Sequence, residues 1–176
     1  MPIRRSVLIK SLVQQFLSER PHSAGETVQF GWFIFRIAEG GQPPRIESLD
    51  FRRMTSFTDD FSEAQRIHSL QLAALRQFQA AECPCTLQQF AIVSTNYTPG
   101  HDGAFIERQR SADGNDSGWY VGIFNDSADM DDPASFRHRS LYELTIHDMR
   151  LAPYWLLPPD ALIPLNHELD IKFGLI

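Results

Sequence analysis

AFIERQRSADGNDSGWYVGIF, residues 104–124, is the stretch that decides the fold class. Two runs with strand length and composition, residues 104–109 and 119–124, stand on either side of a polar loop that contains Asp113-Gly114. Aromatic and β-branched runs are typical of strands, and an Asp-Gly step interrupts them. We therefore expect two strands joined by a turn.

The same pattern of short strands and polar turns continues on both sides of this stretch. Residues 88–95 alternate as a strand does, and Ser140-Leu141-Tyr142-Glu143 is a capping box that predicts a short helix ending before Pro153. The prolines at 158, 159 and 164 keep the next segment extended. Residues 167–173 are expected to form a last strand.

A second group of strands is predicted near the N-terminus. Residues 27–37 are rich in aromatic and β-branched side chains, which predicts one strand buried on both faces, with Gly31 at a bulge or a close backbone approach. A turn at residues 40–44 is followed by an alternating segment, residues 45–51. The economical interpretation is a β-hairpin through that turn.

Two amphipathic helices are predicted in the same half of the chain. Leu8, Leu12 and Phe16 recur at helical spacing with Ile9, Val13 and Leu17 beside them, and Arg20-Pro21 ends this helix. The second helix begins with the capping-box pattern of residues 62–65 and carries one apolar stripe, formed by Ala64, Ile67, Leu70, Ala74 and Phe78. We expect that stripe to face the core.

Together these elements predict an α+β fold with a mostly antiparallel sheet and about three helices. We divide the chain into residues 1–86, with the two helices and the hairpin, and residues 87–176. The strands of the first part are expected either to form an added subdomain or to join the sheet of the second.

Charge separates the two halves. Residues 1–88 carry ten Lys or Arg and nine Asp or Glu, whereas residues 89–176 carry six and thirteen, so the net charges are +1 and −7. Between Ser111 and Phe136 there are six aspartates and no Lys or Arg. Such a surface repels phosphates, so we expect no nucleic acid partner. A solvated acidic loop and a docking site for a basic protein both remain possible interpretations.

The remaining composition indicates a soluble, cytoplasmic chain. No apolar run reaches the ~18 residues of a membrane span, so no membrane partner is expected. Cys83 and Cys85 are separated by one residue, which fits neither a redox pair nor a four-ligand zinc site, and both are expected to be reduced. The pair Arg4-Arg5 resembles the start of an export signal, but Lys10 and two glutamines interrupt the apolar segment that should follow.

Catalytic motifs are not found in the sequence. It has no phosphate-binding glycine loop, no His-Glu-x-x-His and no Gly-x-Ser-x-Gly elbow. We therefore expect neither an enzyme nor a cofactor. One alternative is a metal-dependent enzyme or a small-ligand-binding domain that uses His101, Asp102, Asp113 and Asp116. Another is a scaffolding module that docks through the helix over residues 8–17.

The loop at residues 115–119 carries a resemblance to a known family. Its sequence Asn-Asp-Ser-Gly-Trp follows a strand ending near Arg108, and further on come Asp132-Pro133, Ser140-Leu141 and Pro153. This arrangement, over residues 87–173, resembles the thirty-third catalogued family of bacterial polymorphic-toxin immunity proteins. The four residues Asp116, Ser117, Gly118 and Trp119 match the family's turn motif.

The resemblance implies a protein without catalytic activity that binds a cognate toxin or secretion-system effector and blocks it. Toxins that attack nucleic acids have basic clefts, and an acidic loop complements such a cleft. From charge, we nominate as contact residues Asp113, Asp126, Asp129, Asp131 and Asp132. Tyr120 is added because it should lie on the strand face opposite Trp119, which is expected to be a core residue.

Overall fold

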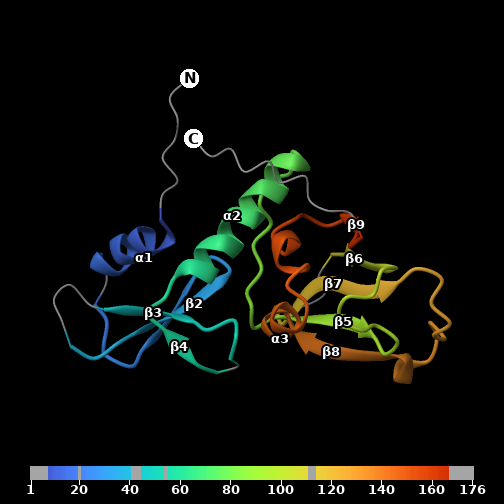
Figure 1. Ribbon diagram of the computed structural model, residues 1–176, viewed down its shortest axis with the longest axis horizontal. Coiled ribbons are helices and arrows are strands. Elements are labelled where there is room, and N and C mark those ends of the chain that lie inside the picture. The colour runs from blue at the N-terminus through green and yellow to red at the C-terminus, as the bar shows by residue number, and fades with distance from the viewer. Residues whose placement is uncertain (1–7, 20, 41–44, 54, 111–113, 167–176) are drawn as a thin grey trace. The chain divides into compact units, whose positions relative to one another are not determined.

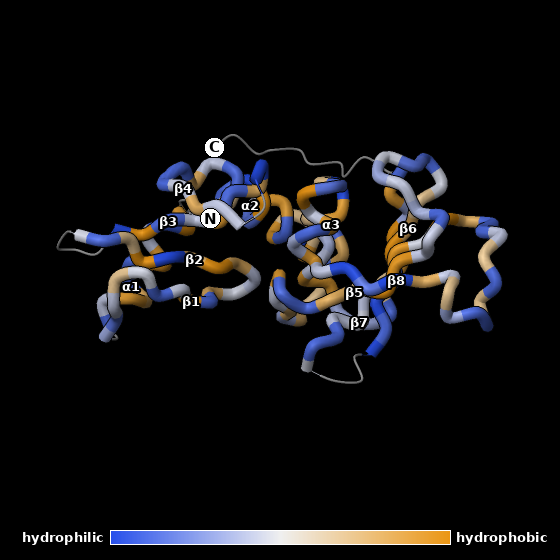
Figure 2. The backbone as a smooth tube through the Cα atoms, turned by 90° about the horizontal axis from the view of Figure 1, so that it is seen from below, coloured by the Kyte–Doolittle hydropathy of each residue, from blue (hydrophilic) through white to orange (hydrophobic). Residues whose placement is uncertain are grey.

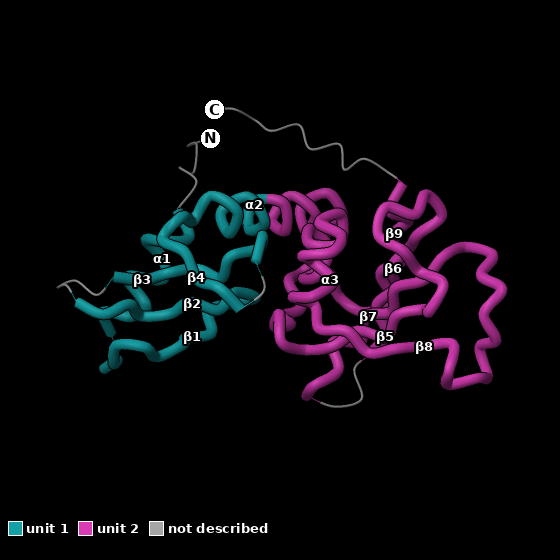
Figure 3. Tube along the Cα trace, turned by 60° about the horizontal axis from the view of Figure 1, so that its bottom comes forward, with its two compact units in different colours: residues 1–69, 172–176 teal, residues 70–171 magenta. Residues whose placement is uncertain are grey.

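The computed structural model describes residues 8–19, 21–40, 45–53, 55–110 and 114–166. They form two compact units (Figure 3), the first within residues 1–69 with 172–176 and the second within residues 70–171. The long helix α2 (Ser62–Gln77) contributes its beginning to the first unit and its end to the second. Three α-helices and two mostly antiparallel sheets confirm the α+β class over the described residues.

The first unit contains a four-stranded antiparallel sheet in the order β1-β2-β3-β4 (Figure 1). Its strands are β1 (Thr27–Phe30), β2 (Phe33–Ile37), β3 (Ile46–Leu49) and β4 (Phe57–Thr58). Helix α1 (Ile9–Ser18) buries Ile9, Val13 and Leu17. The predicted pairing through the turn at residues 40–44 is confirmed, because β2 and β3 are antiparallel partners.

The prediction of one strand over residues 27–37 is wrong, because the chain reverses within it. Gly31 has a φ of +58°, and Phe30 pairs with Phe33 across a two-residue hairpin loop. Glycine adopts such a φ at little cost and is favoured at the first loop position of tight hairpins. Hydrophobicity hid the turn, because Trp32 within the loop is itself buried and β2 begins with the apolar run Phe33-Ile34-Phe35, in a strand that is mostly orange in Figure 2.

Helix α2 begins where the sequence predicts. Asp60 accepts a hydrogen bond from the Ser62 backbone N–H at 2.9 Å, which satisfies a donor at the helix N-terminus. Hydrogen bonds from the side chain and the backbone of Ser62 lower the pKa of Asp60. Ala64, Ile67, Leu70 and Ala74 are buried as expected. The prediction that Phe78 faces the core is wrong, because Phe78 follows the last helical residue and 45% of it is exposed. The helix ends before the stripe reaches it.

The second unit contains a five-stranded sheet in the order β8-β5-β7-β6-β9. Its strands are β5 (Phe90–Ser94), β6 (Ala104–Arg108), β7 (Asp116–Ile123), β8 (Phe136–Ser140) and β9 (Leu162–Pro164). Central β7 pairs antiparallel with β6 and parallel with β5. The two sheets are separate. The strand predicted over residues 167–173 lies outside the described residues.

One face of this second sheet packs against helix α3 (Leu141–His147) and the segment that follows it, which includes the short helix η2 (Ala152–Tyr154). The predicted capping box is confirmed, since Ser140 Oγ accepts a hydrogen bond from the Glu143 N–H at 3.1 Å. The core between the sheet and these helices contains Ile106, Val121, Leu141, Leu151 and Trp155, all essentially inaccessible to solvent.

Candidate partner-binding surface

The Asp-Ser-Gly-Trp motif starts strand β7 and contains a bulge. Phe90 pairs with Asp116, but Ile92 pairs with Tyr120, so β7 has extra residues between the two register points. Gly118 in this bulge has a φ of +76°, a value that glycine adopts at little cost. Ser117 Oγ donates to the Phe90 carbonyl, and Asp116 Oδ1 accepts from the Gly118 N–H. The sequence placed a turn here, whereas the structure shows a strand bulge.

Trp119 points into the core, as expected, and is held there by two partners. Its ring contacts Trp155 edge to face at 5.6 Å, and its Nε1 donates to the Trp155 carbonyl. Arg108 reaches the same place from β6, where it donates to the backbone carbonyls of Ser117, Cys83 and Leu157. The bulge therefore fixes the side on which each following β7 side chain lies.

Tyr120 lies on the opposite face of β7 and is half-exposed, in agreement with the expectation that it faces outward. A Cβ atom at Gly122 would be 2.6 Å from Cε1 of Tyr120, so the ring lies flat over this glycine. Burial, together with the negative charges of Asp126 and Glu107, raises the pKa of the Tyr120 hydroxyl. Glu107 is the cross-strand partner of Tyr120, so one of these carboxylates is its neighbour on the same face.

Asp126 is fixed in position by residues at the end of β5. It accepts hydrogen bonds from Ser94 Oγ and from Asn96 Nδ2, the latter at 2.7 Å. These bonds hold its pKa below the usual range, because they favour the charged carboxylate. Its negative charge consequently has a defined position at the end of strand β5.

The other aspartates of the acidic segment are exposed on the loop between β7 and β8. Asp129 Oδ1 accepts from the Asp131 N–H, and Asp132 Oδ1 accepts from the Ala134 N–H at the start of the short helix η1 (Pro133–Ser135). One oxygen of each carboxylate thus shapes the loop and the other faces solvent. Asp113 lies outside the described residues. The assignment of these residues to a partner stays a prediction.

The residues of the metal-site alternative lie at opposite ends of the β6–β7 hairpin. His101 and Asp102 precede β6, and Gly103 beside them bonds to Phe124, whereas Asp116 begins β7. Eight strand residues at ~3.3 Å each separate these ends by over about 20 Å. Nowhere in the described part of the chain do three His, Cys, Asp or Glu side chains gather as a metal would need.

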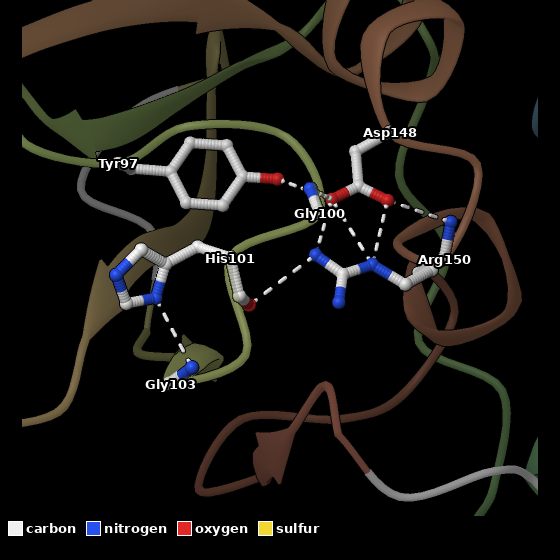
Figure 4. Close-up of polar contacts among 6 residues, drawn as sticks. All are labelled: Tyr97, Gly100, His101, Gly103, Asp148 and Arg150. Carbon is white, nitrogen blue, oxygen red and sulfur yellow. Dashed lines mark hydrogen bonds and ion pairs between the residues drawn. The ribbon is translucent and has the colours of Figure 1, made fainter.

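A buried polar cluster, which the sequence pattern did not indicate, ties the loop before β6 to the end of α3 (Figure 4). Asp148 is only 6% exposed and accepts hydrogen bonds from the Tyr97 hydroxyl, the Gly100 N–H and the Arg150 guanidinium at 2.7–3.2 Å. About fifty residues separate its members, so no local spacing could reveal it.

The pKa shifts of Asp148 and Tyr97 indicate a structural role for the cluster. Burial opposes ionisation of Asp148, but the hydrogen bonds from Arg150, Gly100 and Tyr97 outweigh it and hold its pKa below the usual range. Burial and the bond to Asp148 raise the pKa of Tyr97 far above its ordinary value. Neither group is poised to exchange protons near neutral pH. The cluster therefore stabilises the loop.

Comparison with protein families identifies the family of this chain. The model of the Imm33-like domain matches residues 70–171, more than half of the sequence and the same residues as the second unit. The chain belongs to the Imm33-like domain family, which is consistent with an immunity-protein family and with the resemblance seen in the sequence. Searches of curated proteins and of solved structures found no match.

The described helices were also compared with the requirements of a membrane span. None combines the length and the apolar character needed to cross a bilayer.

Proposed function

We propose that this protein is an immunity protein, which binds a cognate bacterial toxin or secretion-system effector in the cytoplasm and neutralises it without catalysis and without a cofactor. The observation that carries the proposal is the family match over residues 70–171. Within those residues, the acidic segment from Asp126 to Asp132 is the surface that we assign to partner binding.

The geometry of the acidic segment supports a protein partner with a basic surface. Asp129, Asp131 and Asp132 are exposed at neighbouring loop positions, and internal hydrogen bonds hold the loop in shape. Carboxylates arranged in this way attract an opposite charge over roughly a Debye length, ~8 Å at physiological salt. A toxin with a basic cleft would thus meet a surface that is already ordered.

Growth rescue tests this function directly. Each reading frame beside the gene of this chain is expressed from an inducible promoter in a bacterial host, with or without this protein, and the frame that arrests growth identifies the toxin domain. We expect the toxin alone to arrest growth and co-expression to restore it. A folded, expressed protein that neither restores growth nor binds the purified toxin domain would contradict the proposal.

A further inference from the structure

The face of the second sheet that points away from α3 carries apolar side chains that no described element covers. Strand alternation puts Ile92, Phe105 and Tyr120 on this face, since their strand neighbours Ala91, Val93, Ile106, Trp119 and Val121 are buried on the other. Ile92 pairs with Tyr120, and Phe105 pairs with Gly122. Ile92 remains 37% exposed. We call this the outer face.

Aromatic rings on the outer face form a continuous row across the sheet. Phe124 stacks on Phe105 at 4.6 Å, Phe105 meets Tyr120 at 5.8 Å, and Tyr120 meets Phe136 at 6.2 Å. Each of the four side chains is half-exposed or exposed. Side chains of this kind form the anchors of protein interfaces, because they bury much area at little cost in conformational entropy.

Among the described residues, the side chains at this face that are charged at neutral pH are carboxylates, and His138 of β8 lies beside Ile92. Glu107 and Asp126 are the two carboxylates that act on Tyr120, and the exposed aspartates of the acidic segment continue from Asp126. The arginines of the same strands point elsewhere. Arg108 lies in the core, Arg137 donates to the Thr95 carbonyl, and Arg139 of β8 reaches Glu143 of α3 at 3.3 Å. An occupant of the face must therefore supply positive charge around an apolar centre.

We propose that the outer face is the anchoring surface for the toxin, which places apolar residues on Ile92 and Phe105 and a lysine or arginine over Tyr120 and its cross-strand neighbour Glu107. This inference rests on the proposed function and extends its site from the acidic loop to the sheet. A cation over an aromatic ring and beside carboxylates gains from both interactions. The acidic segment speeds encounter, and the outer face holds the complex.

A second copy of this chain is the rival occupant. In a symmetric dimer through the outer face, the carboxylates on the rim of one copy would meet the same carboxylates on the other, and like charges placed together disfavour association. Charge therefore favours a basic protein partner over self-association.

Surface plasmon resonance with the purified toxin domain encoded beside this chain tests the proposal. Ile92→Glu is the main variant. Leu72→Glu is its matched control, because Leu72 on α2 is 36% exposed, almost the same as Ile92. We expect Ile92→Glu to raise the dissociation rate roughly 30-fold or more, as at an interface hot spot, and Leu72→Glu to change it less than about twofold. Glu107→Gln should weaken binding while keeping the shape of the side chain.

Each outcome decides the matter. Circular dichroism and urea unfolding first establish that both variants fold as the wild type does. Unchanged dissociation by Ile92→Glu, or an equal effect of Leu72→Glu, would overturn the outer-face proposal and leave toxin binding intact. Failure of the wild-type chain to bind the toxin would overturn the proposed function as well. A toxin-free dimer in sedimentation velocity that Ile92→Glu dissolves would instead identify a second copy as the occupant.

Discussion

The guanidinium of Arg108 lies over the indole ring of Trp119, with Cζ 5.5 Å from the ring centroid. Both residues are buried, on neighbouring strands, and the arginine bonds only to backbone carbonyls among the described residues. The guanidinium thus joins β6, β7 and two loops of the core at one point.

Replacement of Arg108 should be costly. Arg108→Met keeps the length of the side chain but leaves the carbonyls of Ser117, Cys83 and Leu157 without this donor, and each unsatisfied buried group costs ~1–3 kcal/mol. We expect the free energy of unfolding to fall by about 3 kcal/mol in urea titration. Arg110→Met, at an exposed position, is the control and should stay within ~0.5 kcal/mol. Equal stabilities of the two variants would contradict this role.

Substitution at Gly118 should destabilise the bulge of β7. A β-branched residue is strained at a φ of +76°, so Gly118→Val should lower the free energy of unfolding by roughly 2 kcal/mol. Gly114→Val is the comparison, because no atom within 4 Å would meet the new Cβ and its φ is not in the left-handed region. Thermal or urea unfolding measures both, and a neutral Gly118→Val would mean that the bulge is not under this constraint.

The Asp148 cluster predicts a pH dependence of stability. Its folded pKa lies below the unfolded value of ~3.9, so its contribution is present above that pH and is lost as the pH falls through the lower folded pKa. Asp148→Asn should therefore destabilise the protein at pH 7 by about 3 kcal/mol and flatten the decline in stability below about pH 4. Asp102→Asn, at an exposed neighbouring loop position, should keep the wild-type slope. Parallel curves for all three proteins would refute the prediction.

The acidic segment predicts a salt-dependent association rate. Replacing Asp129, Asp131 and Asp132 with Asn removes three charges but keeps the Oδ1 acceptors that Asp129 and Asp132 use within the loop. We expect slower association with the toxin domain and a weaker dependence on salt, with little change in dissociation, because steering acts before contact. Plasmon resonance at two salt concentrations measures these rates. An unaltered salt slope would remove the acidic segment from the binding site.

Local sequence patterns predicted the helices and strands that depend on neighbouring residues, such as helix caps and apolar alternation. The capping-box patterns at residues 62–65 and 140–143 mark the starts of α2 and α3, and the strand at residues 104–109 corresponds to β6. Strand β8 was not predicted, because Phe-Arg-His-Arg-Ser has no apolar alternation and its ladder depends on β5, over forty residues away. Phe78 was misassigned because periodicity alone does not locate the end of a helix.

The candidate site was predictable in its chemistry but not in its layout. The sequence shows the aspartates and indicates that Tyr120 and Trp119 point in opposite directions. It cannot show that Asp126 is fastened to Ser94 and Asn96, or that rings from three strands form one row, because both depend on strand order. The parallel pairing of β5 with β7 creates that order.

The two outermost strands of the second sheet differ from its inner ones in a way that bears on aggregation. Strand β8 exposes Arg137, His138 and Arg139 in succession, and β9 has three residues and ends in Pro164. Charge, brevity and proline each discourage a foreign strand from extending a sheet. A protein with an exposed apolar sheet face can aggregate by adding strands from other molecules to the edges of that sheet. The composition and length of β8 and β9 disfavour such strand addition.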